Sequence, residues 1–182
     1  MNYRINIKGF EKDLPICRVN DDLYIGAFIM FGDVALTEHC ATELLKEAPE
    51  FDYIVTPEAK SIPLAYEMAK QSGKPYIVAR KVAKAYMKDP FVVNVKSITT
   101  MNVQTLILDR EEADTIKGKR VLIVDDVIST GESLKATEEL VSEAGGNIVA
   151  KMAPLAEGDA CNRADITFLA ELPLFDKDGN VL

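Results

Sequence analysis

The sequence predicts an α/β fold in which helices flank a central parallel sheet and the two ends of the chain form a small hood. Two observations predict the sheet. Short apolar runs alternate with segments of helical spacing, and these runs are apolar at almost every position, as in strands covered on both faces. A length of 182 residues, with 48% hydrophobic residues, is enough for one core. We therefore expect one domain that spans residues 1–182.

The N-terminal part of the chain mixes strand patterns with one helix pattern. Residues 3–7 and 14–19 alternate between apolar and polar side chains, which favours strands, and an apolar patch follows at residues 27–31. Asp33 suits the N-cap of a helix that runs to about Ala48. We expect this part to form most of the hood.

The next segment has the pattern of a strand, a helix and a second strand. Residues 51–56 and 75–80 are apolar and rich in β-branched side chains, and residues 61–73 between them carry apolar side chains at helical spacing. Pro63 is tolerated in a first helical turn, and Gly73 suits a C-terminal cap. The segment predicts a βαβ unit with a right-handed crossover.

A hairpin is predicted after this unit. Residues 91–98 and 103–109 have strand patterns, and the polar residues 99–102 between them are typical of a turn. We expect a mobile hairpin over about residues 91–112 that projects from the sheet.

The order of strand, helix and strand recurs in the second half of the chain. Residues 121–125 predict a strand, a helix follows from about Ser133 to Ala144, and residues 147–153 predict the next strand. Residues 164–176 add one more strand and an apolar tail.

The two ends of the chain are expected to pack together over one edge of the sheet. We expect the hood to comprise about residues 1–50 and 160–182, and the core about residues 51–159.

Two adjacent carboxylates end the central strand, and a possible phosphate loop follows them. Asp125 and Asp126 lie at the carboxyl end of a parallel strand, where open α/β sheets bind ligands. Residues 129–133 then supply hydroxyls and backbone N–H groups at a helix N-terminus, which favours a phosphate, and Gly131 lets the backbone approach it closely. A sugar phosphate fits both features, because its hydroxyls can donate to the carboxylates.

Two other readings of the carboxylate pair stay open. In the receiver domains of bacterial response regulators, two aspartates after a strand bind a divalent metal, but there they lie near the start of the chain. The pair could also cap the turn that follows it.

Basic residues are predicted at the same edge of the sheet. Lys60 lies in the connection after the strand at 51–56, and Arg80, Lys81 and Lys84 follow the next strand. Together these cations would suit a polyphosphate, because they neutralise a leaving group as it departs. Taken alone, Lys60 could also be a solvated lysine in an ordinary connection.

The segment from Val121 to Ser133, VLIVDDVISTGES, resembles the phosphoribosyl-pyrophosphate (PRPP) signature of the type I phosphoribosyltransferases. The stretches EAKSIPLA and ARK resemble the family's pyrophosphate loop and the basic end of its next strand, and the hairpin stands where the family has a mobile active-site loop. The order of these stretches, with Glu157, Gly158 and Arg163 before the last strand, is similar to the purine branch that includes adenine phosphoribosyltransferase.

This resemblance implies the type I phosphoribosyltransferase fold and transfer of the 5-phosphoribosyl group from PRPP to a purine base in purine salvage, adenine being favoured. Pyrophosphate leaves and a nucleoside 5′-monophosphate forms. Asp125 and Asp126 would hold the ribose hydroxyls, and Lys60 and Arg80 are the other expected catalytic residues. The loop residues expected to bind the 5′-phosphate are Ser129, Thr130, Gly131, Glu132 and Ser133. The residues expected at the pyrophosphate are Glu58, Ala59, Lys60, Ser61, Arg80, Lys81 and Lys84. The residues expected to cover the base are Ile25, Ala27, Phe28 and Phe31.

The resemblance also implies Mg²⁺ as cofactor, carried by PRPP near Asp125 and Asp126 instead of by a protein cage. It further implies a homodimer. A net charge of −8 argues against nucleic acid as a partner, and no apolar run is long enough for a membrane helix. The alternating start of the chain has no signal-peptide pattern, so we expect a cytoplasmic protein.

The chain departs from the adenine enzymes in its hairpin. Their mobile loop is rich in glutamate and tyrosine, whereas residues 92–106 contain neither, so no proton donor to the base is assigned, and Met101 stands where glycine is expected. The C-terminal ELPLF is reminiscent of hypoxanthine- or xanthine-directed relatives. Such an enzyme, an orotate-type enzyme and a non-catalytic PRPP sensor are the alternatives.

Overall fold

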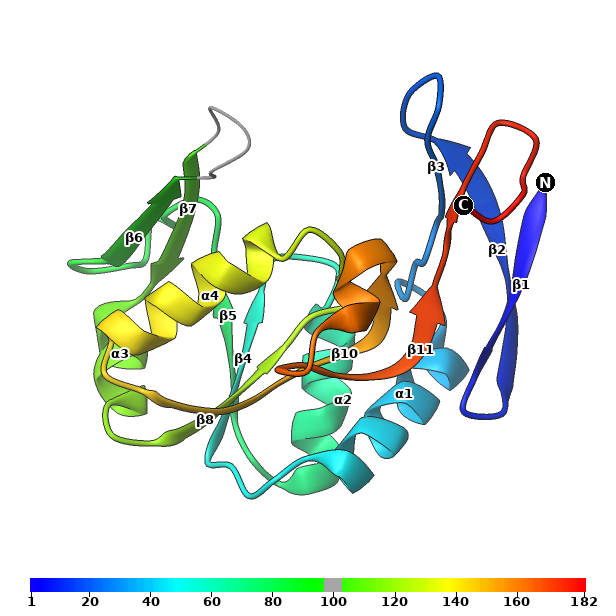
Figure 1. Cartoon of the computed structure of the whole chain (residues 1–182). Helices are drawn as coiled ribbons and strands as arrows, with labels where there is room; N and C mark the ends of the chain where they lie inside the picture. Colours follow the sequence, from blue (N-terminus) through cyan, green and yellow to red (C-terminus); the bar gives the residue numbers. More distant parts are fainter. Residues whose placement is uncertain (97–102) are drawn as a thin grey trace.

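The structure, a computed structural model, describes residues 1–96 and 103–182. Its central sheet has the strand order β11-β10-β8-β4-β5, and the short strand β9 also pairs with β10. Every neighbouring pair along this order is parallel, which confirms the predicted sheet (Figure 1). The strands are β4 (Tyr53–Pro57), β5 (Tyr76–Ala79), β8 (Arg120–Val124), β9 (Val127–Ile128), β10 (Asn147–Glu157) and β11 (Thr167–Leu172).

Helices cover both faces of this sheet. On one face lie α1 (Val34–Glu47) and α2 (Ile62–Ser72), and on the other lie α3 (Arg110–Ile116) and α4 (Glu132–Glu143). In β8, Leu122 packs in the α1 and α2 cluster, whereas its neighbour Ile123 packs in the α3 and α4 cluster. This alternation explains the continuous apolar run, because successive side chains of a strand point to opposite faces.

The hood is an antiparallel sheet in the order β1-β2-β3-β12 (Figure 1). Its strands are β1 (Asn2–Ile7), β2 (Phe10–Arg18), β3 (Tyr24–Gly26) and β12 (Leu174–Phe175). The hood is smaller than expected, because α1 packs on the core and β11 is an edge strand of the central sheet. Strand β11 can pair there because β10 is long and its other edge is occupied by β8.

The predicted hairpin is formed by β6 (Phe91–Lys96) and β7 (Val103–Leu108). Backbone hydrogen bonds of 2.8 Å join Arg80 N–H to Ile107 O and Ile107 N–H to Arg80 O, so the hairpin is attached to the end of β5. The expected turn at residues 99–102, with Met101, lies outside the described residues. The hairpin does not reach residue 112, because α3 begins at Arg110.

Several local predictions can be compared directly with the structure. Asp33 caps α1 by accepting the N–H of Leu36 at 3.1 Å, and Gly73 ends α2 in the left-handed conformation with φ of 68°. The single histidine, His39, donates from Nε2 to the Ile7 carbonyl at 2.8 Å, which joins α1 to the hood. Within the described part of the chain, no helix is both long and apolar enough to cross a membrane.

Candidate active site

The two carboxylates lie at the carboxyl end of β8, as expected for ligand-binding residues of an open parallel sheet. Asp125 and Asp126 are only 8% and 4% exposed. The N–H of Asp125 donates to the Met152 carbonyl at 3.0 Å, and the N–H of Asp126 donates to Asp125 Oδ1 at 2.9 Å. These bonds hold both side chains at the edge of the sheet next to β10.

The surrounding residues compensate the negative charge of this pair only in part. Lys60 Nζ lies 3.0 Å from Asp126 Oδ2, and this oxygen accepts no hydrogen bond from the described residues, so the contact is an ion pair without hydrogen-bond alignment. Burial, together with the negative charge of Asp126, raises the pKa of Asp125 well above its usual value. A ligand that donates hydrogen bonds here would relieve this cost.

The predicted phosphate loop connects β9 to α4. Gly131 adopts φ of 79° at the N-cap of α4, and no side chain caps this helix. The N–H of Glu132 makes a long contact of 3.5 Å with Thr130 Oγ1. The helix dipole favours an anion at this N-terminus.

Two of the predicted cations, Arg80 and Lys84, lie beside the carboxylate of Glu58. Arg80 Nη1 and Lys84 Nζ lie 3.4 and 3.8 Å from Glu58 Oε1, and the Lys81 N–H donates to Oε2 at 3.0 Å. The hydrogen bond from Lys81 and the nearby positive charges lower the pKa of Glu58. In this structure Glu58 is therefore a counter-ion of the cations.

The loop between β4 and α2 is held by its own hydroxyl groups. Thr56 Oγ1 donates to Ser61 Oγ at 2.7 Å, and Ser61 Oγ donates to the Pro57 carbonyl at 3.1 Å, both side chains being buried. Ser61 thus shapes the loop, while Ala59 and Lys60 are exposed at its tip.

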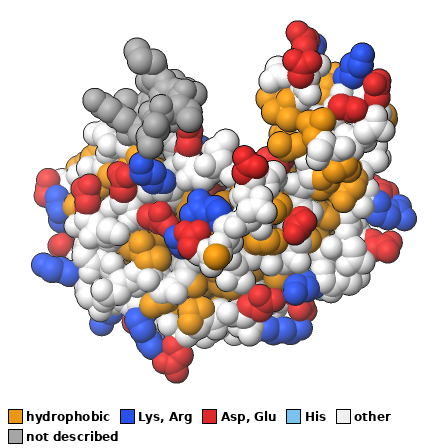
Figure 2. Space-filling view, viewed as in Figure 1, with side chains coloured by type: hydrophobic (Ala, Val, Ile, Leu, Met, Phe, Trp, Pro, Cys, Tyr) orange, Lys and Arg blue, Asp and Glu red, His pale blue; other side chains and the backbone are white. Residues whose placement is uncertain are grey.

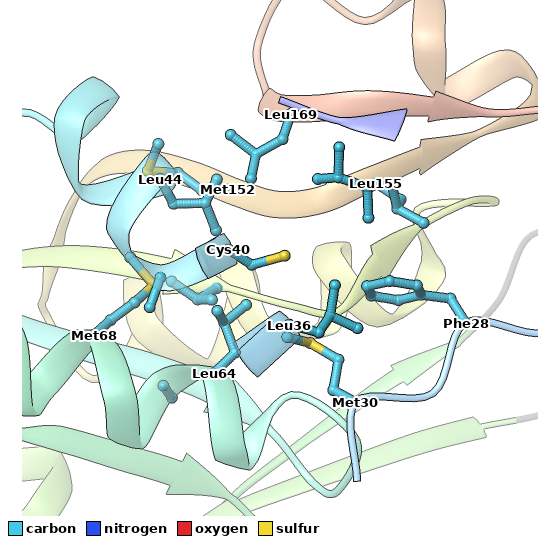
Figure 3. Close-up of a cluster of buried hydrophobic side chains, with 14 of the residues drawn as sticks. Phe28, Met30, Leu36, Cys40, Leu44, Leu64, Met68, Met152, Leu155 and Leu169 are labelled. Carbon is cyan, nitrogen blue, oxygen red and sulfur yellow. The ribbon is translucent and has the colours of Figure 1, made fainter. Parts of the chain in front are cut away.

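The residues expected to cover the base do not share one surface. Phe28 is 4% exposed and belongs to the core cluster drawn in Figure 3, whereas Phe31 is 53% exposed. Ile25 is a β3 residue paired with Cys17 and Leu174, and the Ala27 N–H donates to the Pro15 carbonyl at 2.8 Å. Only part of this set is therefore available to a ligand.

Two further charged residues lie at the site although sequence reasoning gave them no role. Glu157 ends β10 and is half-buried. Burial raises the pKa of its carboxyl group, and the positive charge of Lys60 offsets only part of this increase. Arg163 lies against Gly131 of the phosphate loop. The sequence did contain both residues in the Glu-Gly…Arg order before the last strand. That order indicated a family resemblance, but it did not show where the two side chains lie.

Figure 2 shows a hollow in the surface beside the hood, with acidic and basic side chains close together on the face below it. Within the described part of the chain, no three or more His, Cys, Asp or Glu side chains are grouped so that they could hold a metal ion.

The chain is similar to known phosphoribosyltransferases. A family model described as "Phosphoribosyl transferase domain" matches residues 34–168. The chain is 33% identical over 148 residues to a protein named adenine phosphoribosyltransferase from Kosmotoga olearia, and the match covers 79% of this chain and 83% of that protein. It is also 33% identical over 157 residues to "HGPRTase-like protein 1" from Halalkalicoccus jeotgali, with 82% and 81% covered.

A solved structure shares the fold. The crystal structure of adenine phosphoribosyltransferase from Thermoanaerobacter pseudethanolicus superposes with a TM-score of 0.65 at 23% identity, covering 78% of this chain and 84% of that one. At this identity the likeness concerns the fold alone.

Proposed function

The chain belongs to the phosphoribosyltransferase family, and on that premise we propose that it transfers the 5-phosphoribosyl group of PRPP to a purine base, preferably adenine. Pyrophosphate is released and a nucleoside 5′-monophosphate is formed in purine salvage. The observation that carries the proposal is the meeting of two buried carboxylates, an uncapped helix N-terminus and a set of cations at one edge of the sheet.

The sugar phosphate end is assigned to β8 and α4. The ribose 2′ and 3′ hydroxyls would donate to Asp125 and Asp126, and the 5′-phosphate would accept N–H and hydroxyl hydrogen bonds from residues 129–133. The raised pKa of Asp125 supports this assignment, because a buried carboxylate gains when hydroxyl donors replace lost water.

The pyrophosphate end is assigned to the loop after β4 and to the end of β5. Lys60, Arg80, Lys81 and Lys84 would face the leaving group, with the backbone of Ala59 and Ser61 beside it. As the anomeric C–O bond breaks and the bond to the base nitrogen forms, negative charge moves to pyrophosphate, and these cations stabilise it.

Substrate binding would then exchange ion-pair partners. Lys60 pairs with Asp126, and Arg80 and Lys84 pair with Glu58. Ribose hydroxyls would take the place of Lys60 at Asp126, and the freed Lys60 would turn to pyrophosphate. Positive charge that develops at the sugar during transfer would then lie near the carboxylates.

Mg²⁺ is proposed as a companion of PRPP. Asp125 and Asp126 offer hard oxygen donors of the kind that Mg²⁺ binds, and Asp126 Oδ2 is buried without a hydrogen-bond donor. When bound to PRPP oxygens, the ion would add positive charge to the leaving group.

The base is proposed to be adenine from the names of the relatives, and it would bind between the hood and the hairpin. The exposed members of the expected set, such as Phe31, are candidates to cover it. A hypoxanthine- or xanthine-directed enzyme is the second candidate, favoured by the likeness to the relative named "HGPRTase-like".

A homodimer and a cytoplasmic location remain predictions. The cytoplasmic location is supported by the cysteines Cys17, Cys40 and Cys161, which are all free thiols.

The test is pyrophosphate release by the purified chain with PRPP, Mg²⁺ and one base at a time. We expect release with adenine. Release with hypoxanthine, xanthine or guanine instead would support the second candidate, and release with orotate alone would contradict a purine substrate. Binding of PRPP without release with any base would contradict an enzyme and favour a sensor.

A double variant tests the carboxylates. Asp125→Asn with Asp126→Asn should lower kcat/KM for PRPP by about 100-fold or more, since two charged hydrogen-bond acceptors of the sugar are lost. The hood offers a matched control, the adjacent and exposed pair Asp21 and Asp22, whose double Asn variant removes the same charge. Equal activity of the two double variants would refute the sugar-binding role.

A further inference from the structure

Arg163 lies directly against the backbone of the phosphate loop. A Cβ atom built on Gly131 would lie 2.7 Å from Arg163 Nη1, which is closer than a carbon and a nitrogen can pack. Glycine at 131 therefore serves two purposes: it allows φ of 79°, and it leaves room for a guanidinium group.

The direction of this guanidinium is fixed by Asp165. Arg163 Nε donates to Asp165 Oδ1 at 2.9 Å, and Nη2 donates to Oδ2 at 2.8 Å. This two-pronged geometry uses one edge of the planar group. The hydrogen bonds among the described residues leave Nη1 without an acceptor, and Nη1 is the atom that faces Gly131.

Asp165 is itself paired with Lys151. Lys151, which is 17% exposed, donates to Asp165 Oδ2 at 2.5 Å and lies 2.5 Å from Glu138 Oε1. Lys151 belongs to β10 and Glu138 to α4, so the network ties Arg163 to the helix whose N-terminus forms the phosphate loop. Arg163 is thus preorganised instead of free to move in solvent.

A phosphate bound in the loop at residues 129–133 would need a cation nearby to balance its negative charge. Asp125 and Asp126 precede the loop, and Glu132 lies within it, whereas Lys60, Arg80 and Lys84 lie on the side of the β4 and β5 loops. A phosphate dianion in the loop would meet neutral hydroxyl and N–H donors and nearby carboxylates. Arg163 is the basic side chain observed against this loop.

We infer that Arg163 binds the 5′-phosphate of the ribosyl substrate through Nη1, and that Asp165 is the residue that positions it. The inference rests on the proposed function and deepens it, because it gives the chain a means to select phosphorylated over unphosphorylated ribose. The pyrophosphate end of the site is not involved.

The test compares the full-length chain with Arg163→Gln, Arg163→Lys and Asp165→Asn. Calorimetry measures the affinity for ribose 5-phosphate and, separately, for pyrophosphate with Mg²⁺, and the unfolding temperature is recorded for each variant. Arg4→Gln is the matched control, because Arg4 binds Asp13 in the same two-pronged way, at 2.8 Å for both bonds, on the hood.

We expect Arg163→Gln to weaken ribose 5-phosphate binding by about 10- to 100-fold, the usual range for a hydrogen bond to a charged group, and pyrophosphate binding by less than about 2-fold. Arg163→Lys should recover part of the loss because it keeps the charge, and Asp165→Asn should weaken binding by about 3- to 10-fold through lost orientation. Arg4→Gln should change neither affinity.

Three outcomes would overturn the inference. The first is equal ribose 5-phosphate affinity of Arg163→Gln and the unmodified chain. The second is an equal loss for ribose 5-phosphate and pyrophosphate together with a lower unfolding temperature, which would mean a structural role only. The third is an unmodified chain that binds neither ribose 5-phosphate nor PRPP, and this result would refute the proposed function itself.

Discussion

Asp125 is held in the fold at a cost in stability. Its side chain is buried, it lies next to the charge of Asp126, and its pKa is raised. An aspartate with a raised folded pKa binds protons more readily in the native than in the unfolded state. Stability therefore falls as the pH rises from the usual aspartate value to the raised one, and the full penalty is present above that window.

Asp125→Asn should consequently stabilise the protein while it lowers activity. Asn keeps an oxygen that can accept the N–H of Asp126, but it carries no charge, so we expect the free energy of unfolding at pH 8 to rise by on the order of 1 kcal/mol, since each pKa unit corresponds to about 1.4 kcal/mol. Urea unfolding at pH 8 and at pH 5 measures this gain, which should shrink at the lower pH. A variant that is less stable than the unmodified chain at pH 8 would contradict the explanation.

The residues of the site were predictable to different degrees. Asp125, Lys60 and Gly131 follow from rules about strand ends and helix starts, because those rules depend only on local sequence. Phe28 was expected to cover the base and is buried in the core, and the sequence could not separate these places because an apolar side chain can face a core or a ligand equally well. Glu58 could not be recognised as a counter-ion, because its partners follow more than twenty residues later.

At the scale of elements, α3 was missed although its start is encoded locally. Asp109 and Glu112 form a capping box, in which Glu112 Oε2 accepts the N–H of Asp109 at 3.1 Å. The short helix places Ala113 and Ile116 in the cluster that packs under α4. An Asp followed three residues later by Glu was therefore a readable signal.

Glu112→Ala should destabilise the protein by about 0.5 to 1 kcal/mol, because it leaves the Asp109 N–H without its acceptor at the start of α3. Glu111→Ala is the control, since it removes an acidic residue from the same turn and keeps the capping box. Chemical denaturation of both variants measures the difference. Equal losses would show that charge near the helix start, and not the capping box, stabilises α3.

The two βαβ units were predicted because each strand is apolar throughout and each helix has its own start and end signals. The place of β11 was not predictable in the same way. Its sequence allows a strand in either sheet, and the choice depends on the free edge of β10, which only the assembled sheet defines.

For the whole molecule, the hood and the core share one hydrophobic cluster. It contains Ile7 and Leu14 from the hood, Leu36 from α1, Leu155 from β10, and Phe28. Figure 3 shows the last three side chains within this cluster. Because the cluster is continuous, the hood has no separate core. We expect the protein to unfold in one cooperative transition.

Phe28→Ala should lower the stability of the whole protein by about 3 to 5 kcal/mol, as large core truncations do, and the transition should stay single. Phe31→Ala in the same segment is the control, with an expected change within about 0.5 kcal/mol because the side chain is exposed. Thermal unfolding followed by circular dichroism and by tyrosine fluorescence checks both. Separate transitions for the two probes in Phe28→Ala would mean that the hood folds on its own.

The paired backbone of Arg80 and Ile107 joins the end of β5 to the hairpin. The backbone N–H and C=O of Arg80 are both hydrogen-bonded to Ile107 of the hairpin. Any movement of the hairpin would therefore either move the Arg80 backbone or break both hydrogen bonds. On the proposed function, Arg80 faces the departing pyrophosphate, and its backbone is joined to the hairpin that is expected to cover the site. Movement of that hairpin would then be coupled to release of the product.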